Sequence, residues 1–127
     1  MNPIQEVVVL TDKGARLTLH IVGNFSPEID SQSGDRQTFR AEYLLFDQAG
    51  TTPHHHWLAR IDGIFNTALL AFETLIVHVK KYCTTTGQKV VGIDNPCNCE
   101  FVSKADQQRV AATNGLEAEV TVNARYA

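Results

Sequence analysis

Histidine and cysteine residues in two short segments are the side chains of this sequence best suited to bind a metal. His54, His55 and His56 are consecutive, and Cys97 and Cys99 are separated by one residue. Imidazole and thiolate are good zinc ligands. On a strand, neighbouring side chains point to opposite faces, so His54 and His56 can reach one ion while His55 cannot. The predicted zinc site therefore consists of four residues, His54, His56, Cys97 and Cys99.

The pattern around these residues leaves other interpretations open. Structural zinc sites usually combine two pairs of ligands, and this sequence supplies a single Cys-x-Cys pair. A loop with free thiols and no cofactor is the preferred interpretation, and zinc is the alternative. A thiolate–imidazolium pair is a further one, although no family signature or positioned acid accompanies Cys97 or Cys99. Ser-His-Asp patterns, phosphate loops and dinucleotide fingerprints are absent from the sequence, so we assign no catalytic or cofactor-binding residue.

His20 is a third candidate for chemistry. It belongs to a run in which apolar and polar residues alternate, on the same side as Arg16 and opposite to Leu17 and Leu19. No acidic residue stands close to His20 in the sequence to orient it as a general base. We therefore expect His20 to be a solvated strand residue.

The element that must position these segments is a long amphipathic helix, predicted over residues 61–83. Asp62 is the expected N-cap, and Gly87 is expected to close the helix beyond the β-branched residues 84–86. Cys83 is expected to be a core residue. The apolar positions recur every three or four residues, as in one stripe of a helix: Ile61, Phe65, Ala68, Leu69, Phe72, Leu75, Ile76, Val79 and Cys83.

Leu70 and Val77 lie one heptad apart on this helix and outside the main stripe. Single apolar residues are common on protein surfaces, which is the simpler interpretation. If both are exposed, they favour a homodimer that packs helix against helix.

Strand patterns surround the helix. Residues 6–11 and 15–22 predict a hairpin around Asp12-Lys13-Gly14, and Ser103 predicts the cap of a short helix through residue 112 that Asn114-Gly115 closes. The remaining predicted strands are residues 39–47, 54–61, 88–93 and 116–125, and residues 99–102 are a candidate for a further short extended segment. The fold class is therefore α+β, an antiparallel sheet of about four to six strands with the long helix across one face and the short helix near the C-terminus.

Composition restricts the classes of function. The 127 residues are 43% hydrophobic and 20% charged, as expected for one globular domain over residues 1–127. The net charge of −3 and the absence of a basic cluster argue against nucleic acid. The first ten residues do not resemble a secretory signal, and polar residues interrupt the longest apolar stretch, so we expect no membrane span. Three cysteines are consistent with free thiols in the cytoplasm.

The order of a hairpin, a third strand and an Ile61-Asp62-Gly63 motif before an Ala-Leu-rich helix (residues 67–71) resembles a group of small bacterial proteins of unknown function. The resemblance covers roughly the first two thirds of the chain and implies a fold without implying an activity.

The function predicted from the sequence is non-enzymatic binding to a protein partner or to a second copy of the chain. One form is an immunity-type protein whose acidic loop, with Glu28, Asp30 and Asp35, covers a basic toxin surface. The alternative is a metal-binding or thiol-dependent enzyme that uses the predicted zinc site.

Overall fold

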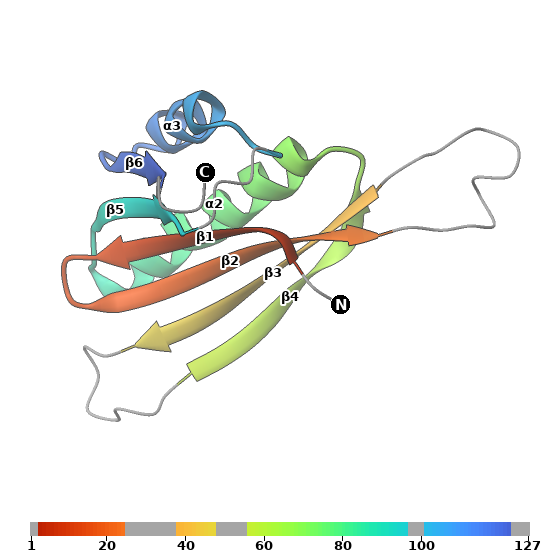
Figure 1. Ribbon diagram of the computed structural model, residues 1–127. Helices are drawn as coiled ribbons and strands as arrows, with labels where there is room; N and C mark the ends of the chain where they lie inside the picture. Colours follow the sequence, from red (N-terminus) through yellow and green to blue (C-terminus); the bar gives the residue numbers. More distant parts are fainter. Residues whose placement is uncertain (1–2, 25–37, 48–55, 97–100, 123–127) are drawn as a thin grey trace, which may run out of the picture.

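The computed structural model describes residues 3–24, 38–47, 56–96 and 101–122. These residues form one six-stranded sheet with the strand order β4-β3-β2-β1-β5-β6 (Figure 1). The fold is α+β, as the sequence predicts. In chain order the elements are β1 (Pro3–Thr11), β2 (Ala15–Asn24), β3 (Thr38–Asp47), β4 (His56–Phe65), α2 (Ala68–Thr86), β5 (Val90–Asn95), α3 (Lys104–Thr113) and β6 (Glu119–Val122).

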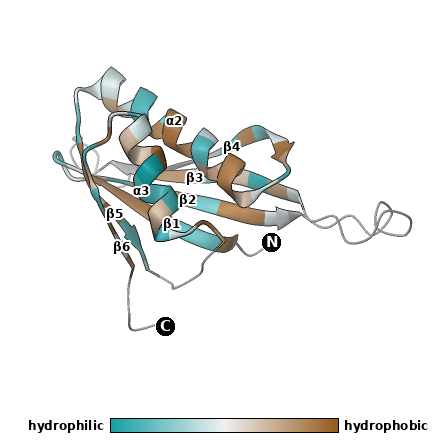
Figure 2. Cartoon of the chain, turned by 90° about the horizontal axis from the view of Figure 1, so that it is seen from above, coloured by the Kyte–Doolittle hydropathy of each residue, from teal (hydrophilic) through white to brown (hydrophobic). Residues whose placement is uncertain are grey.

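One face of the sheet carries the core. Helix α2 contacts β2, β3 and β4 on this face, and α3 contacts both α2 and β6 (Figures 1 and 2). Phe72 and Leu75 of α2 are fully buried against the inward side chains of the hairpin, such as Leu19. Burying these apolar side chains supplies most of the free energy that holds helix and sheet together.

The β1–β2 hairpin forms as its sequence pattern predicts. Gly14 takes a φ of 87° in the turn, a conformation that glycine adopts without steric cost. The hairpin pairs Val9 with Leu17 and Val7 with Leu19, and all four side chains are buried. The alternating pattern therefore identified both the strands and the buried face.

Helix α2 begins later than predicted. Residues 61–65 are the end of β4, where Ile61 pairs with Ala41 of β3, so the predicted start at Ile61 and the Asp62 cap are wrong. Thr67 is the N-cap, and its Oγ1 accepts a hydrogen bond from the Leu70 amide at 3.1 Å. The apolar spacing from Ile61 to Phe65 fits a helical turn, but it also fits two inward positions of a strand, and pairing with β3 decided between them.

The end of α2 is close to the prediction. The helix continues past Cys83 to Thr86, and Gly87 closes it with a φ of 68° and an amide bonded to the Cys83 carbonyl. A left-handed glycine at this position is the common way to end a helix. The helical members of the predicted stripe are buried, apart from the partly buried Leu69.

A bulge near the end of β4 explains why a glycine interrupts this strand. Between the pairs Ala41–Ile61 and Phe39–Phe65, β3 advances two residues while β4 advances four. Gly63 lies inside the bulge with a φ of 112°. The bulge therefore depends on a conformation that residues with a side chain rarely adopt.

Replacing Gly63 with alanine is expected to lower the free energy of unfolding by about 1–3 kcal/mol. No atom lies within 4 Å of the added Cβ, so the cost comes from the backbone and not from a clash. Gly92→Ala is the control, because Gly92 has no positive φ and its added Cβ would meet only the Leu10 Cδ1 at 4.0 Å. Urea unfolding measures both variants, and equal losses in the two would contradict this explanation.

The pairing of the strands in the C-terminal part differs from the predicted antiparallel sheet. β5 pairs with β1 in the antiparallel sense, but β5 and β6 are parallel, so the sheet is mixed and mostly antiparallel. Helix α3 connects these two strands and returns the chain to the end of the sheet where β5 began, which makes the pair parallel. The Ser103 cap is confirmed, since its Oγ accepts from the Asp106 amide at 3.1 Å.

Some boundaries in this part differ from the predicted ones. Residues 88–89 precede β5, and 116–118 lie outside any strand, as do Phe101 and Val102. The predicted strand residues 123–125 and 99–100 lie outside the described residues. The described strand β6 is therefore shorter than the alternating run from which it was predicted.

A buried amide network joins β1, β5 and α3. The Asn95 Nδ2 donates to the Gln107 Oε1 at 2.9 Å, and the Gln107 Nε2 donates back to the Asn95 Oδ1 at 3.0 Å. Gln5 donates to the Asn95 Oδ1 at 3.3 Å and accepts from the Val102 amide at 2.8 Å. All three amide side chains are 1% exposed. Because each amide has hydrogen-bond partners, the network fixes β1, β5 and α3 relative to one another and leaves none of these amide groups unsatisfied.

Candidate functional site

The predicted zinc ligands lie largely beyond what the structure describes. His54, Cys97 and Cys99 are outside the described residues, and His56 is the first residue of β4, in register with Phe46 of β3. Within the described residues, no group of three or more His, Cys, Asp or Glu side chains is arranged to hold a metal ion. The site at His54, His56, Cys97 and Cys99 remains a prediction, and elemental analysis of the purified protein would test it for stoichiometric zinc.

The buried amide network includes residues on both sides of the two predicted cysteine ligands. Asn95 precedes Cys97 and Val102 follows Cys99, and both residues belong to the network. Asn95 and Val102, the described residues on either side of the two cysteines, are therefore held in the body of the domain.

The two apolar residues singled out on α2 are exposed. Leu70 is 44% exposed and Val77 is 54% exposed, while the opposite side of the helix is buried. Glu73 lies between them, one turn from each along the same side of α2. We call Leu70, Glu73 and Val77 the α2 ridge.

A groove separates the α2 ridge from α3. It has a volume of about 260 Å³, with Glu73 and Val77 on the α2 side and Arg109, Val110 and Thr113 on the α3 side. Arg109 is paired with Asp106 on its own helix, at 3.2 Å between Nη2 and Oδ1. The ridge and groove together present apolar side chains beside two oppositely charged ones, which is the composition of many protein-binding surfaces.

The face of the sheet opposite to the core carries a row of ionisable side chains that the sequence analysis missed. Glu6, His20, Glu42 and Arg60 occupy paired positions on β1, β2, β3 and β4. The His20 Nε2 lies 3.0 Å from the Glu6 Oε2, and its Nδ1 lies 3.8 Å from the Glu42 Oε1. The Arg60 Nε lies 3.4 Å from the Glu42 Oε2. Carboxylates thus alternate with an imidazole and a guanidinium across four strands.

This row corrects the interpretation of His20. Its side chain is only 20% exposed and has carboxylates on both sides, so His20 is not a solvated strand residue. Because both ring nitrogens face carboxylates, neither is directed at an open site where a substrate could bind, and the arrangement does not suit a general base. Glu6 and His20 lie seven residues before and after Lys13, so the predicted turn already implied their pairing.

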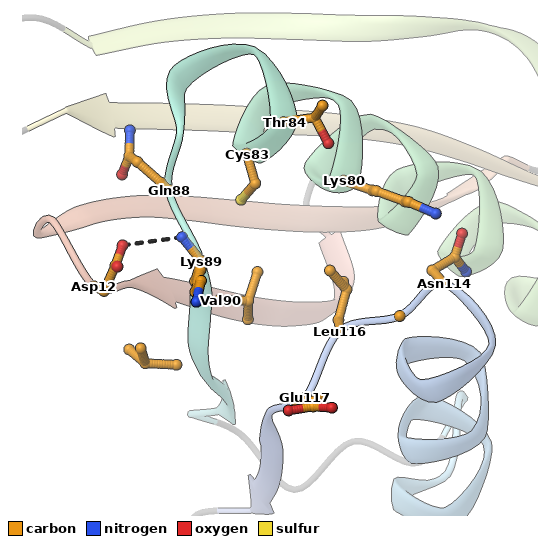
Figure 3. Close-up of a pocket in the computed structure, with 12 residues that line it drawn as sticks. Asp12, Lys80, Cys83, Thr84, Gln88, Lys89, Val90, Asn114, Leu116 and Glu117 are labelled. Atoms are coloured by element: carbon orange, nitrogen blue, oxygen red, sulfur yellow. Dashed lines mark hydrogen bonds between the residues drawn. The ribbon is translucent and has the colours of Figure 1, made fainter.

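A cavity of about 670 Å³ lies at the C-terminal end of α2 (Figure 3). Four segments form it: the β1–β2 turn, the last turns of α2, the start of β5 and the residues between α3 and β6. Cys83 and Val90 are its buried apolar side chains, at 6% and 7% exposed, and Leu116 packs beside them. The charged residues that line it are Asp12, Lys80, Lys89 and Glu117.

Cys83 lines this cavity as part of the core. Burial raises the pKa of the Cys83 thiol, and the negative charge of Asp12 raises that pKa further. Reactive cysteines need the opposite shift, because the thiolate is the nucleophile. The prediction that Cys83 is a core residue is confirmed by its burial.

Neither α2 nor α3, the two helices of the described residues, is both long and apolar enough to cross a lipid bilayer. The chain matches no protein-family model, and no curated protein or solved structure was found to be similar to it.

Proposed function

We propose that this protein is a non-enzymatic binding module that recognises a polypeptide through the α2 ridge and the groove beside it. The observation that carries the proposal is the exposure of Leu70 and Val77, 44% and 54%, on a helix whose other apolar residues are buried or partly buried against the core. Leaving two large apolar side chains on one side of a helix costs hydration free energy that a partner would recover.

The charges around the ridge indicate what kind of polypeptide fits. Glu73 lies between the two apolar residues, and Arg109 lies across the groove from it. A segment with apolar side chains spaced one helical turn apart can place them against Leu70 and Val77 and pair its own charges with Glu73 and Arg109. A second copy of α2 in antiparallel orientation satisfies the apolar condition, since Leu70 of each copy would then meet Val77 of the other.

A photo-crosslinking experiment tests the proposal. Benzoylphenylalanine placed at position 77 is expected to crosslink to one polypeptide species in the cells that make the protein, either a second copy or one partner identified by mass spectrometry. The matched control is position 91, because Val91 is 56% exposed and lies on β5, away from the ridge. Equal crosslinking at both positions would contradict a specific surface on α2.

A second measurement uses the purified protein or the complex so identified. Val77→Asp is expected to weaken association at least tenfold, because it places a charge where an apolar contact is needed. Val91→Asp adds the same charge at a site of similar exposure and should leave association unchanged. Sedimentation over a range of concentrations measures self-association, and titration calorimetry measures binding to a different partner.

The finer form of the proposal is a cytoplasmic bacterial immunity-type protein that covers a basic toxin surface. Its support is the size of the chain, its net charge of −3, and the acidic residues Glu28, Asp30 and Asp35. Those three residues lie outside the described residues. A toxin gene immediately upstream of the coding sequence is the expected finding, and a neighbouring biosynthetic operon would count against this form.

A further inference from the structure

We propose that the cavity at the end of α2 binds a small zwitterion with an apolar body, of the size of an amino acid or a dipeptide. This site is separate from the α2 ridge and does not rest on the function proposed above. Its volume of about 670 Å³ falls within the range of small-molecule sites.

The apolar part of such a ligand has a place to bind. Cys83, Val90 and Leu116 come from three segments and lie around one space in Figure 3. The Cys83 thiol stays protonated because of its raised pKa, so it presents an uncharged, polarisable surface. An aromatic or aliphatic side chain bound here leaves water and gains dispersion contacts.

The charged groups around this space favour a ligand with both signs of charge. Lys80 and Lys89 are balanced by Asp12 and Glu117, so the lining has no net charge from these four residues. The Asp12 Oδ1 accepts a hydrogen bond from the Lys89 backbone amide at 2.9 Å, which holds the turn against β5. Within the described part of the chain, none of these four side chains forms an ion pair.

Of these four groups, we assign Lys80 and Glu117 to the charged ends of the ligand, because Asp12 and the Lys89 backbone already join the β1–β2 turn to the residues before β5. They lie at different positions around the space in Figure 3, Lys80 on α2 and Glu117 on the segment that leads into β6. A carboxylate beside Lys80 and an ammonium beside Glu117 would each form a charge-assisted hydrogen bond. A ligand with one charge would satisfy one of these groups and leave the other without a partner.

The binding test uses three probes with the same phenyl group: phenylalanine, 3-phenylpropionate and phenethylamine. Titrations followed by amide chemical shifts in the full chain are expected to show saturable binding of phenylalanine in the millimolar range. The shifts should centre on Cys83, Val90 and Leu116. The two singly charged probes should bind about fivefold more weakly or worse, because each lacks one charge-assisted hydrogen bond.

Two variants with matched controls test the assigned groups. Lys80→Gln and Glu117→Gln are each expected to weaken phenylalanine binding about five- to tenfold. Lys81→Gln and Glu119→Gln remove the same charges from neighbouring exposed residues that do not line the cavity, and they should leave binding unchanged. The four substitutions are at exposed side chains, so the amide spectrum of each variant should retain the dispersion of the folded protein.

Three results would overturn the proposal. The first is the absence of saturable shifts around the cavity at 20 mM phenylalanine, a ceiling about an order of magnitude above millimolar binding. The second is binding of 3-phenylpropionate or phenethylamine as tight as that of phenylalanine. The third is an equal loss in the variants and their controls. Val77→Asp should bind phenylalanine normally, so failure here and failure of the α2 ridge can be told apart.

Discussion

Replacing Phe72 with alanine is expected to lower the free energy of unfolding by about 3–5 kcal/mol. Phe72 is 0% exposed and is the largest of the fully buried side chains in the described residues. The substitution removes a ring that packs between α2 and the sheet and leaves a cavity that the surrounding side chains fill only in part. Because a domain of this size is stable by about 5–15 kcal/mol, the loss is a large fraction of the total.

Urea unfolding followed by circular dichroism measures this effect. Lys81→Ala is the control, since Lys81 is exposed on the same helix, and its unfolding free energy should stay within about 0.5 kcal/mol of the original. If Phe72→Ala were as stable as the control, α2 would not be packed on the sheet, and the described fold would be wrong.

Replacing Asn95 with alanine is expected to cost about 2–4 kcal/mol, although Asn95 contributes almost nothing to the apolar core. Its amide nitrogen donates to the Gln107 Oε1 at 2.9 Å and to the Thr121 carbonyl at 3.2 Å. Alanine leaves both oxygens without this donor inside the protein, where an unsatisfied polar group carries its full desolvation cost.

Asp94→Ala is the matched control for this prediction. Asp94 precedes Asn95 in β5, and its carboxylate accepts one hydrogen bond, from the Thr121 Oγ1 at 3.0 Å. Loss of this more exposed contact should cost about 1 kcal/mol or less. Hydrogen exchange gives a second measurement: the Val102 amide, which donates to the Gln5 Oε1 at 2.8 Å, should exchange faster in Asn95→Ala than in Asp94→Ala.

The two ends of α2 show why one helix boundary was predictable and the other was not. Gly87 ends the helix through its own backbone conformation, a local property that is visible in the sequence. The start depends on whether residues 61–65 pair with β3 or continue into a helical turn, and this is a contact with residues about twenty positions away. Local patterns do not contain that information.

The same distinction holds for the candidate sites. The exposure of Leu70 and Val77 was recognised because it follows from the period of the helix. The position of α3 beside them could not be recognised in this way, because it depends on tertiary packing. The cavity at the end of α2 combines four segments that are distant in the chain, and no pattern in any one of them indicates it. The contacts of His20 were predictable only in part. The turn at Lys13 implied its pairing with Glu6, while the contact with Glu42 depends on the register of β3.

By itself, the sequence determined the class of the fold, the β1–β2 hairpin, the buried stripe of α2 and the caps at Ser103 and Gly87. These features depend on periodicity and on the conformational preferences of single residues, which act over a few positions. The tertiary structure decided the strand order, the parallel pairing of β5 with β6, the bulge at Gly63 and the groups that meet in the cavity. Each of these depends on which distant segments come into contact, and the free energy of those contacts is set by the whole chain.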